Sequence, residues 1–524
     1  MAPRMVVSKP TDRHPPLYVG NQVCATCHDS ISRSYALTPM ALTSGPVGED
    51  LVEGSFRQKT TSIFCQIVKK GNAAFLNYER SDDPALRGSQ QLKYFIGSGR
   101  RGHSYLSTLD SFMYESPASY YSTEKRWDVS PGYESRREIR FNRPIEPSCL
   151  YCHAGQVKPI DGTQNAYEVP PFAQAGIGCE QCHGPGGDHV KGLATLVNPA
   201  TLPPQRRDSV CEQCHLSGES RVNQPGKDLS MFRPGDLLSD YVLSFVFQDK
   251  ADHSSEAISH VEALAQSGCK LRSGDSMSCM SCHDPHFVPS SEDATAYFRA
   301  KCIACHLKQA ASDHLKQHFA KNDCRSCHMS KTPLTNIRHT ALTDHRIPRK
   351  PSRDATPIEP EAKLVQFGAR ENNRRGLALA YGELALQKGN SFYQEQAFRL
   401  LTEVLPQCSD DAEVLTRLGY LHQSRGELDR AASLYTSALK YAPHQTAAQV
   451  NLGVIYAQRG QTDHAVALWR QALASNPGLS EAGVNLAVAV LTKGDKAEAR
   501  DILQRVLRFN PDFGSARELL HKIE

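Results

Sequence analysis

The last third of the chain repeats one pattern of apolar and small positions every 34 residues. A leucine, a glycine, an alanine, one large apolar residue and a proline recur in the same order. The recurring positions are Leu418, Leu452 and Leu486; Gly426, Gly460 and Gly494; Ala431, Ala465 and Ala499; Tyr435, Trp469 and Leu503; and Pro443, Pro477 and Pro511. The spacing predicts two antiparallel helices in each repeat, with small residues where the helices cross and a proline that closes the second helix.

This period and pattern are typical of tetratricopeptide repeats. We place three repeats at about 412–445, 446–479 and 480–513, inside a helical repeat domain at 371–524. A less regular helical pair before them is expected to cap one end of the array, and 514–524 to begin a cap at the other. Stacked repeats present a concave face, which favours binding of a partner protein or peptide over a purely stabilising role.

Two other patterns divide the rest of the chain. Residues 91–133 are rich in tyrosine, glycine and serine with short alternating apolar positions, which predicts strands and turns. We therefore expect a β- and loop-rich aromatic insert at about 50–145, inside a first domain of residues 1–345. Residues 346–361 carry four prolines and no apolar period, which predicts a Pro-rich linker at 346–370.

The first domain contains seven copies of the pentapeptide Cys-x-x-Cys-His. This is the spacing of covalent c-type haem attachment, in which two thiols form thioethers with the haem vinyl groups and the histidine binds the iron from the proximal side. The predicted attachment residues are Cys24, Cys27, Cys149, Cys152, Cys179, Cys182, Cys211, Cys214, Cys279, Cys282, Cys302, Cys305, Cys324 and Cys327. The predicted proximal ligands are His28, His153, His183, His215, His283, His306 and His328. The pattern indicates seven covalent haems c.

Other uses of these cysteines explain the pattern less well. A structural zinc site pairs two CxxC elements, which leaves the following histidine unexplained, and seven motifs do not divide into pairs. Cysteines at this spacing also rarely staple a chain of 524 residues as disulfides. Three cysteines lie outside the motifs. We expect Cys65 and Cys269 to form a disulfide or to be buried free thiols, and Cys408 to be a core residue.

The ligand on the distal side of each iron decides what a haem can do. A second histidine gives a six-coordinate electron carrier of low potential, a methionine raises the potential, and an open position permits substrate chemistry. The first domain has ten further histidines, enough for seven irons: His14, His103, His189, His253, His260, His286, His314, His318, His339 and His345. We take as candidate distal ligands His103, His189, His260, His286, His318, His339 and His345, with Met40 as a rival for the first haem. For each of them a solvated or packing role is the alternative.

Charge and hydropathy narrow the class of protein. The formal net charge is +4 without an arginine-rich stripe, which argues against nucleic-acid binding. No stretch predicts a transmembrane helix, and the opening twenty residues lack the apolar region of an export signal. Because haem is attached to c-type apoproteins outside the energy-transducing membrane, we still expect a periplasmic or extracellular protein.

The stretches around the motifs resemble a known family. They are YVGNQVCATCHDSI, IGSGRRGHSYL, WDVSPGYE, GIGCEQCHGPGGDHV, VCEQCHLSGES, MSCMSCHDPH, and DCRSCHM followed by TDHRIPR, and together they touch nearly all of 18–349. They are similar to the multihaem cytochromes related to the tetrahaem partner of hydroxylamine oxidoreductase, including bacterial proteins that join such a domain to tetratricopeptide repeats. The resemblance implies an exported redox protein with mostly bis-His haems in close stacked pairs, and its last two motifs resemble a doubled CxxCH module. It supports as distal ligands, without assigning them to irons, His189, His286, His318, His339 and His345.

These patterns predict a mainly α fold with much irregular loop, in which a haem-packed cytochrome c domain precedes an α-solenoid. We expect electron transfer with redox partner proteins rather than catalysis, because the histidine supply allows every distal position to be filled. The alternative is a multihaem oxidoreductase that acts on a small nitrogen or sulfur compound at one open haem. The sequence lacks the CxxCK motif that related nitrite reductases often carry. A weaker third interpretation is a scaffold that assembles a redox complex.

Overall fold

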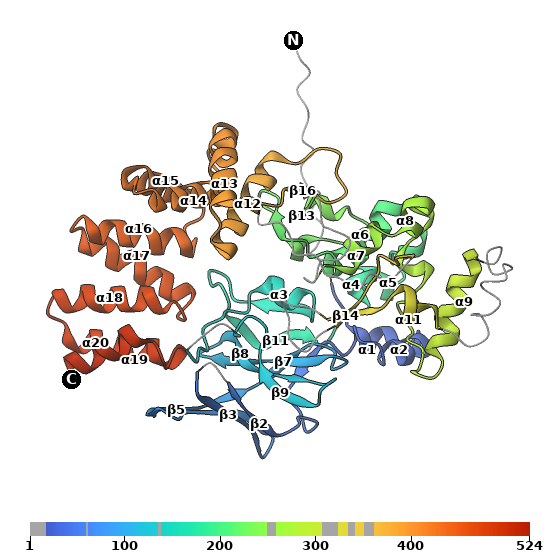
Figure 1. The fold of residues 1–524 in the computed structure, drawn as a ribbon, viewed down its shortest axis with the longest axis horizontal. Coiled ribbons are helices and arrows are strands. Elements are labelled where there is room, and N and C mark those ends of the chain that lie inside the picture. Colours follow the sequence, from blue (N-terminus) through green and yellow to red (C-terminus); the bar gives the residue numbers. More distant parts are fainter. Residues whose placement is uncertain are drawn as a thin grey trace, which may run out of the picture.

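The computed structural model describes residues 17–58, 61–134, 138–248, 258–306, 323–333, 341–349 and 361–524. Figure 1 shows a column of paired helices, α12 to α20, along one side of the molecule, and a mixed domain of sheets and short helices beside it. Within the mixed domain, the sheets of β2 to β9 lie at one end, and most of the short helices lie on the side away from the column.

Two antiparallel sheets build the segment that follows the first motif. One has the order β2 (Gly54–Gln58), β3 (Ile63–Lys70), β4 (Ala73–Arg80), β5 (Asp83–Leu92); the other has the order β1 (Ser44–Pro46), β6 (Tyr94–Ile96), β7 (Gly102–Leu109), β8 (Phe112–Tyr121), β9 (Arg126–Val129). Ile63, Cys65 and Ile67 alternate along β3 and are buried, as in a strand with one face on a core. Tyr105 and Trp127 of the other sheet pack in the same core. The strands predicted within 91–133 are present.

The prediction of a mainly α fold is only partly right, because the first domain is rich in strands. Further antiparallel pairs are β10 (Gly155–Pro159) with β11 (Tyr167–Gln174), β12 (Ser220–Asn223) with β13 (Val242–Phe247), and β14 (Lys331–Pro333) with β15 (Ala341–Thr343). Strand β13 shows a physical reason why strands form in this domain. Its sequence VLSFVF is buried at nearly every position, which suits a central strand covered on both faces.

The helices that carry the CxxCH motifs are short, and several end at the motif histidine. The helices of the first domain in its described residues are α1 (Asn21–Ala25), α2 (Asp29–Tyr35), α3 (Pro147–Tyr151), α4 (Glu180–His183), α5 (Gly187–Val190), α6 (Pro204–His215), α7 (His260–Ala265), α8 (Gly268–Ser273), α9 (Ala294–His306) and α11 (Cys324–His328). Short 3-10 turns are η1 (Pro199–Thr201), η2 (Leu229–Met231), η3 (Leu238–Asp240), η4 (Gly274–Ser276) and η5 (Cys279–Ser281).

The carboxyl-terminal column is a stack of antiparallel helix pairs. Its elements are α12 (Arg374–Lys388), α13 (Ser391–Val404), the turn η7 (Leu405–Gln407), α14 (Ala412–Ser424), α15 (Leu428–Tyr441), α16 (Thr446–Gln458), α17 (Thr462–Ser475), α18 (Ser480–Thr492), α19 (Lys496–Phe509) and α20 (Gly514–Ile523). Gly419 and Gly453, which lie where the two helices of a repeat cross, have a clear steric role. A Cβ at Gly419 would lie 2.8 Å from the Tyr435 ring, and one at Gly453 would lie 2.5 Å from Nε1 of Trp469. The small residues therefore let the two helices of each pair approach.

The segment predicted as a linker contains a strand. Leu364–Gln366 form β16, which pairs antiparallel with β13 and completes the sheet β12-β13-β16. Leu364 is 3% exposed and shares a core with Phe245 and with Leu379 of α12. The chain therefore enters the repeats through a packed sheet.

The far end of the column also contacts the first domain. The Tyr114 hydroxyl of β8 donates to Oδ1 of Asn476 at 3.1 Å, and the Phe141 N–H donates to the Phe509 carbonyl at 2.7 Å. Arg80 of β4 forms an ion pair with the largely buried Asp512. Because both ends of the column are packed against the first domain, the repeats form an arch fixed at two points (Figure 1).

The three cysteines outside the motifs are free thiols. Cys65 lies 4% exposed in the sheet core, where burial raises its pKa to about 12. Cys269 is half-buried near the thiols of Cys282 and Cys305, and Cys408 packs at the edge of the core under α12. The structure therefore contains the free thiols and not the disulfide.

The buried carboxyl of Glu115 makes stability depend on pH. Burial raises its pKa to about 7, although Arg143 Nη1 lies 2.8 Å away and opposes the shift. Between about pH 4.5 and 7 the folded protein therefore binds more protons than the unfolded chain, so stability falls as pH rises through this window. We expect Glu115→Gln to remove about 2 to 3 kcal/mol of this dependence. Unfolding of both proteins at pH 5 and pH 7 measures it, with exposed Glu168→Gln as the control. Parallel pH profiles for wild type and Glu115→Gln would contradict the assignment.

Candidate haem centres

Each attachment motif is folded as about one helical turn. The His28 N–H donates to the Cys24 carbonyl at 3.0 Å, and the His183 N–H donates to the Cys179 carbonyl at the same distance. Residues at i, i+3 and i+4 of such a turn are neighbours on one side. The two thiols and the imidazole of a motif can therefore reach one porphyrin.

Four pairs of nearly parallel imidazole rings occur within the described ranges, each joining a motif histidine to a candidate distal histidine. They are His28 with His189 (ring centroids 6.4 Å apart, planes at 17°), His183 with His286 (5.9 Å, 11°), His215 with His260 (6.2 Å, 17°) and His283 with His345 (6.2 Å, 28°). A metal–imidazole bond is about 2 Å long and the ring centre lies about 1 Å behind the nitrogen, so two imidazoles across one iron have centroids about 6 Å apart. The spacing of the pairs fits a bis-His haem.

The hydrogen bonds made by Nδ1 of several histidines leave their Nε2 available for iron. Backbone carbonyls accept from Nδ1 of His183 (Val197, 2.7 Å), His189 (Ala194, 3.3 Å), His328 (Pro348, 3.0 Å) and His345 (Thr343, 3.0 Å). A proton on Nδ1 leaves the lone pair on Nε2, and an Nδ1–H bond to a carbonyl is the usual support of a metal-bound histidine.

His260 also has an Nε2 that is available for a metal, although no Nδ1 hydrogen bond to a carbonyl supports its ring in the described residues. Its Nε2 is buried and has no hydrogen-bond partner in the part of the chain that the structure describes. Burial, with further contributions from His345 and His215, lowers its pKa to about 3, so the ring is neutral. A buried, neutral imidazole with a free nitrogen opposite His215 suits a metal ligand, so the donor chemistry fits haem.

The other sequence candidates lie elsewhere. His103 is on β7, where its ring packs 4.5 Å from Phe95. Met40 lies in the turn after α2, and the ring opposite His28 belongs to His189 instead. His318 and His339 lie outside the described residues. In the described ranges no imidazole ring faces His153, whose Nδ1 is 2.8 Å from the Thr43 hydroxyl.

Cysteines of different motifs lie close together. The neighbouring pairs, which influence each other electrostatically, are Cys24 with Cys179, Cys152 with Cys214, Cys211 with Cys279, and Cys302 with Cys324. The rings of His260 and His345, which face the histidines of the fourth and fifth motifs, are 4.4 Å apart. The attachment sites are therefore packed edge to edge.

Known proteins resemble both parts of the chain. Residues 416–480 and 459–523 match tetratricopeptide repeat families, and 114–184 match the family described as cytochrome c554 and c-prime. The multiheme cytochrome MtrA of Shewanella baltica is 28% identical over 177 residues, which are 31% of this chain and 53% of MtrA. The dissimilatory sulfite reductase MccA of Wolinella succinogenes is 28% identical over 179 residues, 29% of this chain and 22% of MccA. The chain is a multihaem cytochrome fused to tetratricopeptide repeats.

The cytochrome spans about half the length of the first of these relatives, and less of the second. Among solved structures, a crystal structure of MamA is 19% identical with a TM-score of 0.25, covering 27% of this chain and 81% of MamA. A tetratricopeptide repeat protein from Parabacteroides merdae is 22% identical with a TM-score of 0.25, covering 29% of this chain and 59% of that protein. In the described portion of the cytochrome, no helix is both long and apolar enough to cross a membrane.

The inner residues of two motifs hold the motifs of the cytochrome against one another, which sequence reasoning missed. Gln213 of the fourth motif accepts from the Tyr151 hydroxyl of the second at 2.8 Å and donates to the Gln181 carbonyl of the third at 3.2 Å. Gln181 in turn donates to the Ala154 carbonyl at 3.2 Å. The available signal was that the third and fourth motifs both read CEQCH, with large polar residues at positions that haem attachment does not specify.

Glu180, the other inner residue of the third motif, anchors the first motif. Its carboxylate is 5% exposed and accepts from the backbone N–H groups of Val19, Gly20 and Gly186 at 2.8 to 2.9 Å. Gly20 immediately precedes α1, which carries Cys24. A charged acceptor with three backbone donors is a strong local constraint, so Glu180 sets where the first motif lies relative to the third.

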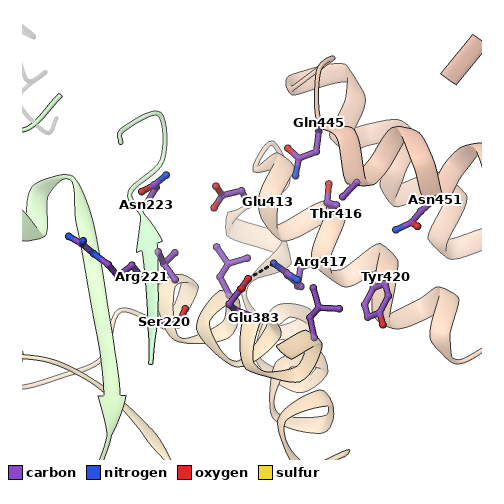
Figure 2. A pocket seen from close by; sticks show the side chains of 14 residues that line it. Ser220, Arg221, Asn223, Glu383, Glu413, Thr416, Arg417, Tyr420, Gln445 and Asn451 are labelled. Atoms are coloured by element: carbon purple, nitrogen blue, oxygen red, sulfur yellow. Dashed lines mark hydrogen bonds and ion pairs between the residues drawn. The ribbon is translucent and has the colours of Figure 1, made fainter. Parts of the chain in front are cut away.

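A cavity of about 480 Å³ lies between the first domain and the repeats (Figure 2). Strand β12 contributes one wall, including Arg221, and helices α12, α14 and α16 contribute the other. Arg417 and Glu383 form an ion pair on the repeat side at 3.1 Å. Figure 2 shows the Arg221 guanidinium directed away from the repeat helices, so only its stem borders the cavity.

Proposed function

We propose that the cytochrome is an extracytoplasmic electron-transfer protein with seven covalent haems c, most of them ligated by two histidines. The observation that carries the proposal is the set of four parallel imidazole pairs with centroids 5.9 to 6.4 Å apart. A haem with both axial positions filled has no site for a substrate and exchanges electrons.

The roles of the chain's own residues follow from this geometry. The paired cysteines of each motif anchor one haem, and the motif histidine is its proximal ligand. The distal ligands are His189 for the first motif, His286 for the third, His260 for the fourth and His345 for the fifth. Bound haem supplies a one-electron iron couple. Carbonyl bonds at Nδ1 fix the ring planes, which limits reorganisation when the charge on the site changes.

The contacts between motifs suggest the order of the electron path. Neighbouring attachment cysteines place the first motif beside the third, the second beside the fourth, the fourth beside the fifth, and the sixth beside the seventh. The third and fourth are joined through Gln213 and Gln181. We therefore propose a continuous path through the first, third, fourth and fifth motifs, with the second motif as a branch from the fourth.

The repeats are proposed to dock a redox partner protein or one of its peptides on their concave face. The arch is fixed to the first domain at β13 and at β8, so it holds this face at a constant position relative to the haem motifs. A docked partner would therefore be held beside the domain without a flexible connection, which favours reproducible electron transfer.

One observation favours a second function. No imidazole faces His153 in the described ranges, so the haem of the second motif is a candidate for an open iron. One relative is named as a dissimilatory sulfite reductase. The alternative proposal is therefore an oxidoreductase that acts on a small nitrogen or sulfur compound at this position.

An EPR spectrum of the fully oxidised cytochrome, recorded before and after addition of nitrite, separates the two functions. Only low-spin ferric signals, unchanged by nitrite, are expected for an electron carrier with filled coordination spheres. A high-spin signal that shifts with nitrite would replace electron transfer by the catalytic alternative. Intact mass after export tests the haem count independently.

A further inference from the structure

Arg221 joins two attachment motifs through one carbonyl group. The residue lies on β12, paired with Ser244 of β13. Its Nη1 donates to the carbonyl of Gln213, inside the fourth motif, at 3.1 Å. The sulfur of Cys152, the second attachment cysteine of the second motif, lies 3.8 Å from the same carbonyl oxygen. The guanidinium therefore lies where the second and fourth motifs meet, and Cys152 is close enough to Arg221 and Cys214 to interact electrostatically with both.

Arg221 forms no ion pair with a carboxylate in the part of the chain that the structure describes. Its Nε and Nη2 are buried and have no hydrogen-bond acceptor among the residues that the structure describes. Other cations beside the attachment motifs are paired: Arg207 of the helix that carries the fourth motif with Asp208 at 2.9 Å, and Lys270 with the same carboxylate at 3.4 Å. An arginine stays protonated, and a buried unpaired cation is costly.

We infer that Arg221 raises the reduction potentials of the haems on the second and fourth motifs. The inference rests on the proposed haem attachment at those motifs. Reduction adds one electron to an iron, and a fixed positive charge in a poorly solvated place stabilises the reduced form of a nearby group. Because Arg221 borders both sites, one side chain acts on two haems. It is thus a potential-setting residue for the branch between the second and fourth motifs.

The cavity provides a matched control. Arg417 lines the same cavity from the repeat side, but its guanidinium is paired with Glu383 at 3.1 Å and lies away from both motifs. Arg221→Met removes the charge and keeps much of the stem, Arg221→Lys keeps the charge, and Arg417→Met removes a cavity arginine that has no motif contact.

The test is an optical redox titration of the three variants and the wild type, each purified with its haems after export. In Arg221→Met we expect two of the one-electron components to move to lower potential. At a given applied potential their ratio of reduced to oxidised haem should fall about tenfold, which corresponds to a shift of about 59 mV for a one-electron couple. Arg221→Lys should recover most of the shift, and Arg417→Met should match the wild type.

The outcomes separate this inference from the proposed function. Intact mass and mass mapping of the haem-bearing peptides report whether the second and fourth motifs carry haem; a wild-type protein without haem there defeats the proposed function itself. Full haem content with unchanged potentials in Arg221→Met overturns only the role of Arg221. Equal changes in the Met and Lys variants, or haem loss in Arg221→Met, identify a structural role and overturn it as well.

Discussion

Replacing His260 by alanine will convert one low-spin haem of the cytochrome into a high-spin haem. His260 lies opposite His215 with ring centroids 6.2 Å apart, and its buried Nε2 has no other partner in the described chain. Alanine removes the sixth ligand and leaves the covalent attachment at Cys211 and Cys214 intact. About one seventh of the haem should therefore change spin state, which EPR and the optical spectrum both measure.

The same result is expected, one haem at a time, for the alanine variants of the other three distal candidates, His189, His286 and His345. His521→Ala is the matched control, because His521 is exposed on α20 in the repeat domain. Each variant should retain its full haem mass, since the thioethers do not depend on the distal ligand. An unchanged low-spin spectrum in His260→Ala would remove the bis-His assignment of the fourth motif.

Glu180→Ala is expected to destabilise the fold strongly. It leaves the N–H groups of the partly buried Val19 and Gly20 and of the buried Gly186 without their acceptor. Each unsatisfied group costs about 1–3 kcal/mol, so we expect a loss on the order of 5 kcal/mol in unfolding free energy. The first motif should be affected most, because Gly20 immediately precedes α1, the helix that carries Cys24. Thermal unfolding and the low-spin signal of the first haem measure the two effects.

Two companion variants sharpen this experiment. Glu180→Gln keeps an oxygen acceptor at nearly the same place and should lose less stability than alanine. Glu168→Ala removes an exposed glutamate from the neighbouring strand β11 and should change stability little. If Glu180→Ala and Glu168→Ala unfold at the same temperature, the buried carboxylate does not anchor the first motif.

Parts of the site could be predicted because they are local in the chain. The CxxCH spacing names its attachment residues without reference to the rest of the fold, since one helical turn brings them together. The distal ligands were only a set of candidates, because each comes from a different segment than its motif: His189 follows the third motif but faces His28 of the first. Met40 is near His28 in sequence, yet the opposite ring is His189. Chain proximity is therefore a poor guide to the distal side.

The sequence by itself determined the repeat architecture and the attachment chemistry, because both depend on spacing within a single helix or helix pair. The tertiary structure alone decided which histidines face each other, where Arg221 lies, and how Glu180 and Gln213 join the motifs. It also decided that the first domain is rich in strands and that Leu364 enters a sheet instead of a free linker. These features depend on contacts between residues far apart in the chain, and periodic patterns carry no information about such contacts.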